Sequence, residues 1–282
     1  MRQARAILGA TPVYFLLLAA AAAAVVPFLW MVLTAFKTGP EIYQWPPSIL
    51  PATWTFDNFT KAWGTGNFPR LFLNSAIVAV SATLLNLLFD SMAAFAFARL
   101  RFPGRDALFG VVLTTMMLPA VVTIIPLFLI VKGLPAPGAG GWLNSYAGIV
   151  APGAATAFGI FLFRQYFQTI PKELDEAMML DGAGLWRIYW QLVLPLAKPA
   201  AVTVAIFTFV YQWNDFLWPL VVATDADMYT VQVGMSYFTT EHGIDWPLLM
   251  AAAVIVTLPV LLLYACLQRY FIGGLTMGGS KE

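Results

Sequence analysis

The chain has few of the side chains on which most enzyme active sites are built. Its 282 residues include one histidine and one cysteine, and charged residues make up only 10% of the sequence. One histidine and one cysteine cannot assemble the usual protein metal sites, and Cys266 has no partner for a disulfide within the chain. A net charge of +1 gives no sign of the basic surface that nucleic-acid binding needs. We therefore expect neither a metal site nor a nucleic-acid partner.

A phosphate-binding loop is also missing. The pattern GxxxxGK[ST] occurs nowhere, so the chain is not expected to bind or hydrolyse ATP itself. The stretch Gly182-Ala183-Gly184 begins like a dinucleotide-binding fingerprint, but it lacks the preceding strand and the third glycine. No set of residues suggests a catalytic site either. The sequence therefore predicts a protein that is not an enzyme and has no cofactor of its own.

Long apolar runs dominate what is present. Hydrophobic residues make up 60% of the chain, which is far above the share in soluble globular proteins. Six runs are long enough to cross a hydrocarbon core of about 30 Å. We therefore predict an all-α polytopic membrane protein, with residues 1–282 forming one domain. Its expected spans are residues 13–36, 71–98, 107–131, 145–163, 199–223 and 247–267.

The basic residues are distributed unequally between the two sides of this membrane arrangement. One side receives Arg2, Arg5, Arg99, Arg101, Arg105, Arg164, Lys172, Arg187, Lys198, Arg269 and Lys281. The other side receives only Lys37, Lys61, Arg70 and Lys132. Lysine and arginine accumulate in cytoplasmic loops. Both termini are therefore expected to be cytoplasmic, in the cell (inner) membrane of a bacterium or archaeon.

Residues 170–198 form the one amphipathic, charge-rich segment of the chain. Pro171 suits a first helical turn, and Glu173, Asp175 and Glu176 place negative charge where a helix N-terminus favours it. Gly182 can end this helix, because glycine accepts the left-handed conformation of a helix C-terminus. A second short helix then extends toward the next apolar run. The segment is therefore predicted to be a cytoplasmic pair of helices joined at Gly182, with an apolar stripe suited to docking.

Three short motifs in this segment resemble a known family. Glu176-Ala177-Met178, Asp181-Gly182-Ala183 and Leu192-Val193-Leu194-Pro195 resemble the EAA loop of permease subunits in binding-protein-dependent ABC importers for carbohydrates, of the type of the second permease of maltose transporters. Met178 stands where the family usually has a second alanine. In that family the loop is the coupling helix, which seats in a groove of the ATPase subunit. An amphipathic helix lying on lipid is the alternative, although such helices usually carry basic rather than acidic polar faces.

The resemblance covers nearly the whole chain and implies several partners. A second homologous permease subunit would complete a heterodimer, and two ATPase subunits would bind the ATP and magnesium. A solute-binding protein would deliver the solute from outside, and the loop that carries Asp225, Asp227, Glu241 and Asp245 offers it an acidic surface. In that loop His242 is expected to be an ordinary exposed polar residue. The residues implied for ATPase coupling are Glu176, Ala177, Met178, Asp181, Gly182 and Ala183.

Two polar residues lie within the second predicted span. Asn86 and Asp90 share a helical face with Thr83, and this face should not contact lipid. Asp90 needs a partner on another helix or subunit, or a water-filled path. We favour hydrogen bonding between helices over contact with a solute. An ion-coupled secondary transporter that uses Asp90 and Asp215 is the alternative function.

The fifth predicted span carries a second polar cluster. Tyr211, Asn214, Asp215 and Trp218 have the spacing of one helical face, and Trp213 lies among them. Aromatic rings and hydrogen-bonding groups on one face would suit a sugar, and the stretch resembles the family's Trp-Asn-acid-Phe motif. Asn214 and Asp215 could equally bond neighbouring helices. All five residues are candidates for the substrate path.

The C-terminal stretch of residues 268–281 is rich in glycine, so we expect no stable helix there. Gly274, Leu275 and Thr276 resemble the family's Gly-Leu-Thr-x-Gly ending, which is thought to reach into the ATPase dimer. A disordered terminus is the alternative. The sequence as a whole predicts a permease subunit that forms half of the translocation path of an ATP-driven importer, for a sugar or a related polyhydroxylated solute.

Overall fold

The computed structural model describes residues 2–135, 141–240 and 243–276. Its elements are helical throughout the described residues, apart from one pair of two-residue strands, so the all-α prediction is confirmed. The chain divides into two compact units, which are described separately. Residues 241–242, to which Glu241 and His242 belong, lie outside the described part, as do residues 277–282.

Unit 1 consists of residues 1–69 and 235–258. An aromatic cluster follows its first long helix, where Phe36 contacts the rings of Trp54, Phe56 and Phe59. The amide of Asn58 donates to the carbonyl oxygens of Ala35 and Lys37, which the end of the helix would otherwise leave without partners. The elements are α1 (Arg2–Ala35), α2 (Gly39–Ile42), α3 (Asp57–Gly64), η1 (Thr65–Asn67), η5 (Met235–Phe238), the antiparallel strands β1 (Thr239–Thr240) and β2 (Gly243–Ile244), and the first part of α15 (Trp246–Thr276).

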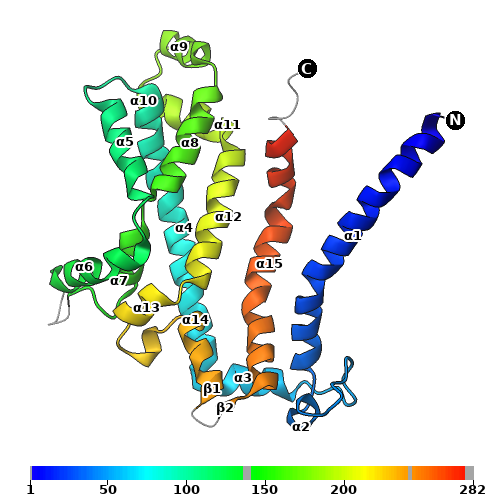
Figure 1. The fold of residues 1–282 in the computed structure, drawn as a ribbon. Coiled ribbons are helices and arrows are strands. Elements are labelled where there is room, and N and C mark those ends of the chain that lie inside the picture. Colours follow the sequence, from blue (N-terminus) through cyan, green and yellow to red (C-terminus); the bar gives the residue numbers. More distant parts are fainter. Residues whose placement is uncertain (1, 136–140, 241–242, 277–282) are drawn as a thin grey trace. The chain divides into compact units, whose positions relative to one another are not determined.

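Unit 2 consists of residues 70–234 and 259–282. Within it α8 packs against both α5 and α12 (Figure 1). The interior holds fully buried aromatic and aliphatic side chains, among them Phe163, Phe167 and Val204. The elements before the second half of α15 are α4 (Phe68–Arg99), α5 (Arg105–Thr115), α6 (Ala120–Gly133), α7 (Tyr146–Val150), η2 (Ala151–Gly153), α8 (Ala157–Thr169), α9 (Lys172–Leu180), α10 (Leu185–Ile188), the π-helix η3 (Tyr189–Val193), α11 (Leu194–Leu196), α12 (Lys198–Asn214), α13 (Leu217–Val222), η4 (Ala226–Met228) and α14 (Val231–Gly234).

Helices of membrane-spanning length and hydropathy are present among the described residues. Three continuous candidates are Val13–Ala35, Asp57–Arg99 and Trp246–Gln268. Three further candidates are pairs of helices with a bend between them, so up to six spans result if each pair crosses the membrane once. The long apolar runs of the sequence therefore correspond to helices, and half of the candidates are bent.

The third and fourth predicted spans are not continuous helices. Between α5 and α6 the axis turns by 103°, and α6 begins directly after Pro119, whose missing N–H suits a helix start. Between residues 146–153 and α8 the bend is 44°. There the hydroxyl of Thr156 accepts from the N–H of Gly159 and caps α8. Pro119 and the capping hydroxyl of Thr156 therefore mark the two breaks.

The fifth predicted span is also broken, and the expectation of a single helical face is wrong. Helix α12 ends at Asn214, Asp215 has an extended backbone (φ −69°, ψ 121°), and α13 begins at Leu217. Residues on the two sides of Asp215 therefore do not follow one helical period. Which of them lie together is decided by the packing of two helices.

The glycine-rich end of the chain differs from the prediction as well. Helix α15 continues through Gly274 and Leu275 to Thr276. Extending an existing helix by one residue requires no new nucleus, so the long apolar helix can continue into residues of low propensity. A glycine costs about 1 kcal/mol relative to alanine at such a position. The expectation of a non-helical stretch is therefore wrong as far as Thr276.

Candidate functional site

The turn at Gly182 ends α9 in the predicted way. Gly182 has φ +80°, in the left-handed region. The N–H of Ala183 donates to the carbonyl of Met178 at 2.9 Å, and the N–H of Gly182 donates to that of Met179 at 3.0 Å. These two bonds form a Schellman motif, which satisfies carbonyl groups that a helix end leaves free. After this turn α10, the π-helix η3 and α11 follow in place of one regular second helix.

A buried ion pair joins α9 to the end of α4. Arg99 Nε lies 3.0 Å from Asp175 Oδ2, and the two side chains are 4% and 11% exposed. Arg99 Nη2 also donates to the carbonyl of Ile170 at 3.0 Å, just before α9. Burial raises the pKa of the Asp175 carboxyl even though Arg99 and Lys172 attract its charge. Arg99 therefore holds the start of α9 at two points.

The sequence pattern did not reveal this ion pair. From the sequence, Asp175 is expected only as part of the solvent-facing negative charge at the start of this helix, and Arg99 only as a marker of the cytoplasmic side of the membrane. Asp175 is buried, so that expectation is wrong for its side chain. No local spacing connects two residues on different helices, and the only available signal was a carboxylate beside the apolar positions of a short helix.

The side chains of α9 and its turn divide into two groups. Met178 packs against the buried interior of unit 2, and Ala183 belongs to that interior. Glu176, Ala177, Asp181 and Gly182 are exposed. Leu180 is 90% exposed and adds an apolar side chain to this exposed group. The outward surface of α9, defined here as Glu176, Ala177, Leu180, Asp181 and Gly182, is thus available to a partner.

A second contact ties the π-helix η3 to α4. The hydroxyl groups of Tyr189 and Ser91 are 2.7 Å apart and form a hydrogen bond. The ring of Tyr189 also packs edge-on against Phe95, with ring centroids 5.4 Å apart. Both halves of the segment 170–198 are therefore attached to the same long helix.

The polar residues within α4 have partners in the chain. Asp90 is fully buried and accepts hydrogen bonds from the N–H of Thr156 at 2.7 Å and from its hydroxyl at 2.8 Å. Asn86 donates to the carbonyl of Gly153 at 2.6 Å. A methyl group on Gly159 would lie 1.9 Å from Asp90 Oδ2, so the contact depends on a bare glycine. The expected hydrogen bonding between helices is what the geometry shows.

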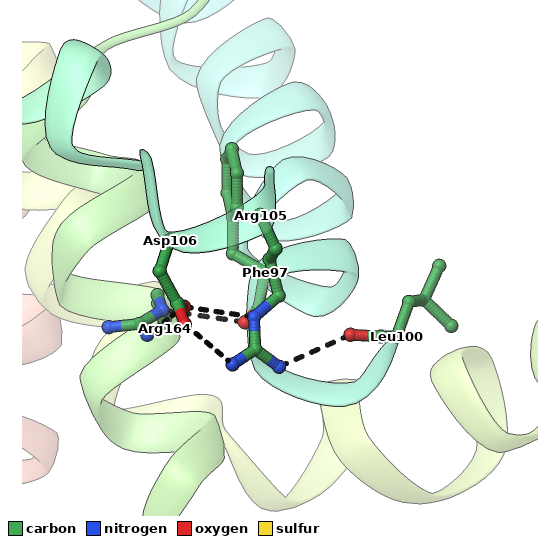
Figure 2. A network of polar contacts seen from close by, with 5 residues as sticks. All are labelled: Phe97, Leu100, Arg105, Asp106 and Arg164. Carbon is green, nitrogen blue, oxygen red and sulfur yellow. Dashed lines mark hydrogen bonds and ion pairs between the residues drawn. The ribbon is translucent and has the colours of Figure 1, made fainter. Parts of the chain in front are cut away.

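The basic turn after α4 forms a network with α8, which Figure 2 shows in close-up with Arg105 and Arg164 both pointing at Asp106. Arg105 Nε lies 3.0 Å from Asp106 Oδ1, and Arg164 Nη2 lies 3.8 Å from the same atom. The guanidinium groups also donate to the carbonyls of Leu100 and Phe97. The hydrogen bond from Arg105 lowers the pKa of the Asp106 carboxyl. This network fixes the turn between α4 and α5.

A pocket of about 300 Å³ lies where the fifth predicted span is broken. Tyr211, Asp215 and Trp218 line it, although the helix between them is interrupted. Gln212 and Gly153 line it as well, and these two had not been expected. The indole N–H of Trp218 donates to the carbonyl of Ile149 at 3.2 Å, which holds this ring in the pocket wall.

The other two candidates for the substrate path lie elsewhere. Trp213 is 1% exposed and packs against the rings of Phe72 and Phe209. Asn214 donates to the carbonyl of Val210 and accepts from the amide of Gln232. Neither residue lines the pocket of Asp215. Trp213 therefore packs in the interior, and Asn214 is bonded to its own helix and to Gln232.

Three features are typical of a membrane transport subunit: bent apolar helices, buried polar contacts between these helices, and an exposed amphipathic helix pair. Residues 90–276 match the family described as the inner membrane component of binding-protein-dependent transport systems, and the chain belongs to this family. It is thus a multi-pass inner-membrane permease of an ABC importer. This membership favours the permease over the ion-coupled secondary transporter.

Several relatives are similar over most of their length. The diacetylchitobiose uptake system permease protein NgcG of Streptomyces coelicolor is 37% identical over 267 residues, which are 93% of this chain and 86% of that protein. The arabinooligosaccharides transport system permease protein AraQ of Halalkalibacterium halodurans is 34% identical, with coverage of 92% and 91%. The sn-glycerol-3-phosphate transport system permease protein UgpE of Yersinia pestis is 34% identical, with coverage of 83% and 84%.

A solved structure has the same fold. A chain of a bacterial ABC transporter involved in the import of the acidic polysaccharide alginate matches with a TM-score of 0.83 and 26% sequence identity, covering 96% of this chain and 98% of that one.

The described residues contain no group of three or more His, Cys, Asp or Glu side chains arranged to hold a metal ion.

Proposed function

We propose that this chain is one of two different permease subunits in an ATP-driven importer of a sugar or related polyhydroxylated solute. The names of similar permeases support this solute class, because diacetylchitobiose and arabinooligosaccharides are both saccharides. Two ATPase subunits would bind ATP and magnesium, and a solute-binding protein would deliver the solute. One observation carries the proposal. The outward surface of α9 is exposed, while the buried ion pair of Asp175 with Arg99 attaches the same helix to α4.

The outward surface of α9 is proposed to dock on the ATPase. Leu180 and Ala177 offer apolar contacts, while Glu176 and Asp181 offer charges to a basic rim. The excess of lysine and arginine on one side supports a cytoplasmic location for this segment and both termini, where they would meet the ATPase. The end of α15, with Gly274, Leu275 and Thr276, would approach the ATPase from the same side.

A continuous set of contacts leads from this surface to the pocket. Movement of α9 would act on Arg99 through Asp175, and movement of η3 would act on α4 through the bond between Tyr189 and Ser91. Farther along α4, Asn86 is bonded to Gly153, which lines the pocket. Rigid helices joined by buried polar contacts can move together as one body, so ATPase closure could reshape the pocket.

Reconstitution tests the proposal directly. A thermal-shift screen of saccharides on the cognate binding protein identifies the solute, and proteoliposomes with all partner chains then measure its uptake. We expect uptake only with ATP and the ATPase subunits present. Uptake that persists without the ATPase would instead support an ion-coupled secondary transporter.

Cysteine labelling tests the orientation separately. In a Cys266→Ser background, cysteines at Thr240 and Gly184 should react with an impermeant reagent from opposite sides of sealed vesicles. Labelling of both positions from the same side would contradict the proposed topology. Cys266 is exposed, so its removal is needed for a clean background.

A further inference from the structure

The pocket at Asp215 contains polar groups that the chain leaves available. Tyr211 is 65% exposed, and neither its hydroxyl nor the amide of Gln212 has a hydrogen-bond partner in the described part of the chain. The carboxyl of Asp215 accepts from the N–H of Trp218 at 3.4 Å, a long bond that leaves acceptor sites on a group with two oxygens. Three hydrogen-bonding side chains therefore meet in one pocket.

The pocket wall has room for these groups because of Gly153. A methyl group on Gly153 would lie 2.8 Å from the Nε2 atom of Gln212, so the bare backbone lets the amide take its place. The indole of Trp218, held by the carbonyl of Ile149, adds a flat apolar surface. A volume of about 300 Å³ is at the lower end of small-molecule sites, which suits a single ring better than a long chain.

We propose that this pocket is a subsite for one uncharged, hydroxyl-rich sugar ring. Asp215 and Gln212 bind hydroxyl groups of the ring, the Tyr211 hydroxyl adds a third polar contact, and Trp218 packs against its C–H surface. The inference rests on the proposed function and deepens it, since it places a solute contact in this permease subunit.

The charge of the pocket determines which solutes are excluded. Asp215 is the only ionisable acid or base among the described lining residues apart from the Tyr211 phenol, and no lysine or arginine lines the pocket. A carboxylate or phosphate on the solute would be taken from water without a cationic partner, which is costly. The ring bound here therefore carries no anionic group, in contrast to alginate and to sn-glycerol 3-phosphate, which similar transporters are named for.

Protection of a cysteine in the pocket tests this subsite without using ATP hydrolysis. Thr123 lines the pocket, so Thr123→Cys in a Cys266→Ser background reports on its occupancy in the purified complex. Diacetylchitobiose, arabinotriose and maltotriose are the uncharged probes, and glycerol 3-phosphate and a mannuronate trisaccharide are the anionic probes. At millimolar concentration, at least one uncharged probe should slow modification by a small thiol reagent. Neither anionic probe should do so.

Two substitutions locate the contacts, and a third is the control. Asp215→Asn should raise the half-protecting concentration about tenfold or more, and Tyr211→Phe should raise it about fivefold, in proportion to the hydrogen bonds removed. Asp57→Asn makes the same chemical change at an exposed position outside the pocket, and this variant should be protected like the parent. Tyr211→Phe removes only a hydroxyl group, so it keeps the test valid if Asp215→Asn does not assemble.

The outcomes separate the two proposals. Equal protection by charged and uncharged probes, no protection by any probe, or parental protection in both pocket variants would overturn the subsite. If protection is as expected but uptake does not depend on ATP, the proposed ATP-driven importer is overturned and the subsite is still supported.

Discussion

Two regions of unit 2 carry polar residues among apolar ones, and they differ in whether these polar side chains have partners within the chain. Along α4, Asn86, Asp90 and Arg99 each contact a group on another element. At the break between α12 and α13, Tyr211 and Gln212 instead face a pocket without a hydrogen-bond partner in the described residues. Both regions contain an aspartate, so residue type alone does not distinguish them.

The difference indicates which polar groups hold the structure and which await a ligand. Polar groups that are bonded to another element stabilise the packing, whereas polar groups that face a pocket without a hydrogen-bond partner are available to a ligand. Substitutions along α4 should therefore reduce stability and assembly, whereas substitutions in the pocket should reduce solute binding.

The largest effect is expected for Asp175→Ala. Removal of the carboxylate leaves the Arg99 guanidinium buried and unpaired, at a cost of about 3–5 kcal/mol, because arginine cannot lose its proton. A lower thermal unfolding midpoint and the loss of copurified ATPase should result. Glu173→Ala on the exposed side of α9 is the matched control and should change neither quantity.

The opposite truncation, Arg99→Met, should be milder and should depend on pH. The Asp175 carboxyl left behind can take up a proton, and burial already raises its pKa above 3.8. The folded state then binds a proton more tightly than the unfolded state, so stability increases as the pH falls from neutral toward 3.8. A variant whose unfolding midpoint falls on acidification over this range would contradict the assignment.

Next in size is Gly159→Ala, which places a methyl group 1.9 Å from Asp90 Oδ2. Either Asp90 or α8 must move, and overpacking of this kind costs about 1–3 kcal/mol. Gly110→Ala has open space around it and should be neutral or stabilising in the same melting assay. Tyr211→Phe, which changes the pocket and not α4, should leave the melting curve unchanged. Equal losses in Gly159→Ala and Tyr211→Phe would remove the distinction between the two regions.

Gly182→Val tests the turn of the coupling segment. Nothing lies within 4 Å of a methyl group at Gly182, so the expected cost of about 1–2 kcal/mol comes from the positive φ alone. The helices should form normally, but copurified ATPase and solute-stimulated hydrolysis should decrease. Gly184→Val is the control, since Gly184 has φ −77° and equally open surroundings. Gly182→Asn should fall between the two, because asparagine tolerates the left-handed region.

The smallest effect is expected at the exposed Asp106. Its pKa lies below 3.8 because Arg105 donates to it, so its contribution is present above pH 3.8 and is lost as the pH falls through the lowered value. Asp106→Asn should shift the melting midpoint only slightly at neutral pH, since solvent screens exposed ion pairs. The shift should shrink further in high salt. A large, salt-independent loss would show that the network of Figure 2 matters more than its exposure suggests.

The properties of consecutive residues were enough to predict part of this protein. Hydropathy over a window of residues predicted apolar helices, the glycine after α9 predicted a left-handed turn, and the motifs around Glu176 and Asp181 predicted the family. These features depend on neighbours in the chain, because helix length, capping and backbone conformation are local. The same reasoning was wrong at Asp215 and at the end of α15, where local preference competes with helix packing and propagation.

Tertiary structure alone decided which polar residues have partners. Asp90 and Thr156 are 66 residues apart, and Arg99 and Ile170 are 71 apart, so no local pattern could join them. Packing across the break at Asp215 likewise brings Trp218 of α13 into one pocket with Tyr211, Gln212 and Gly153, whereas Trp213 lies in the interior. Hydrogen bonds and ion pairs form across a few ångströms of space, whereas the sequence orders residues only along the chain.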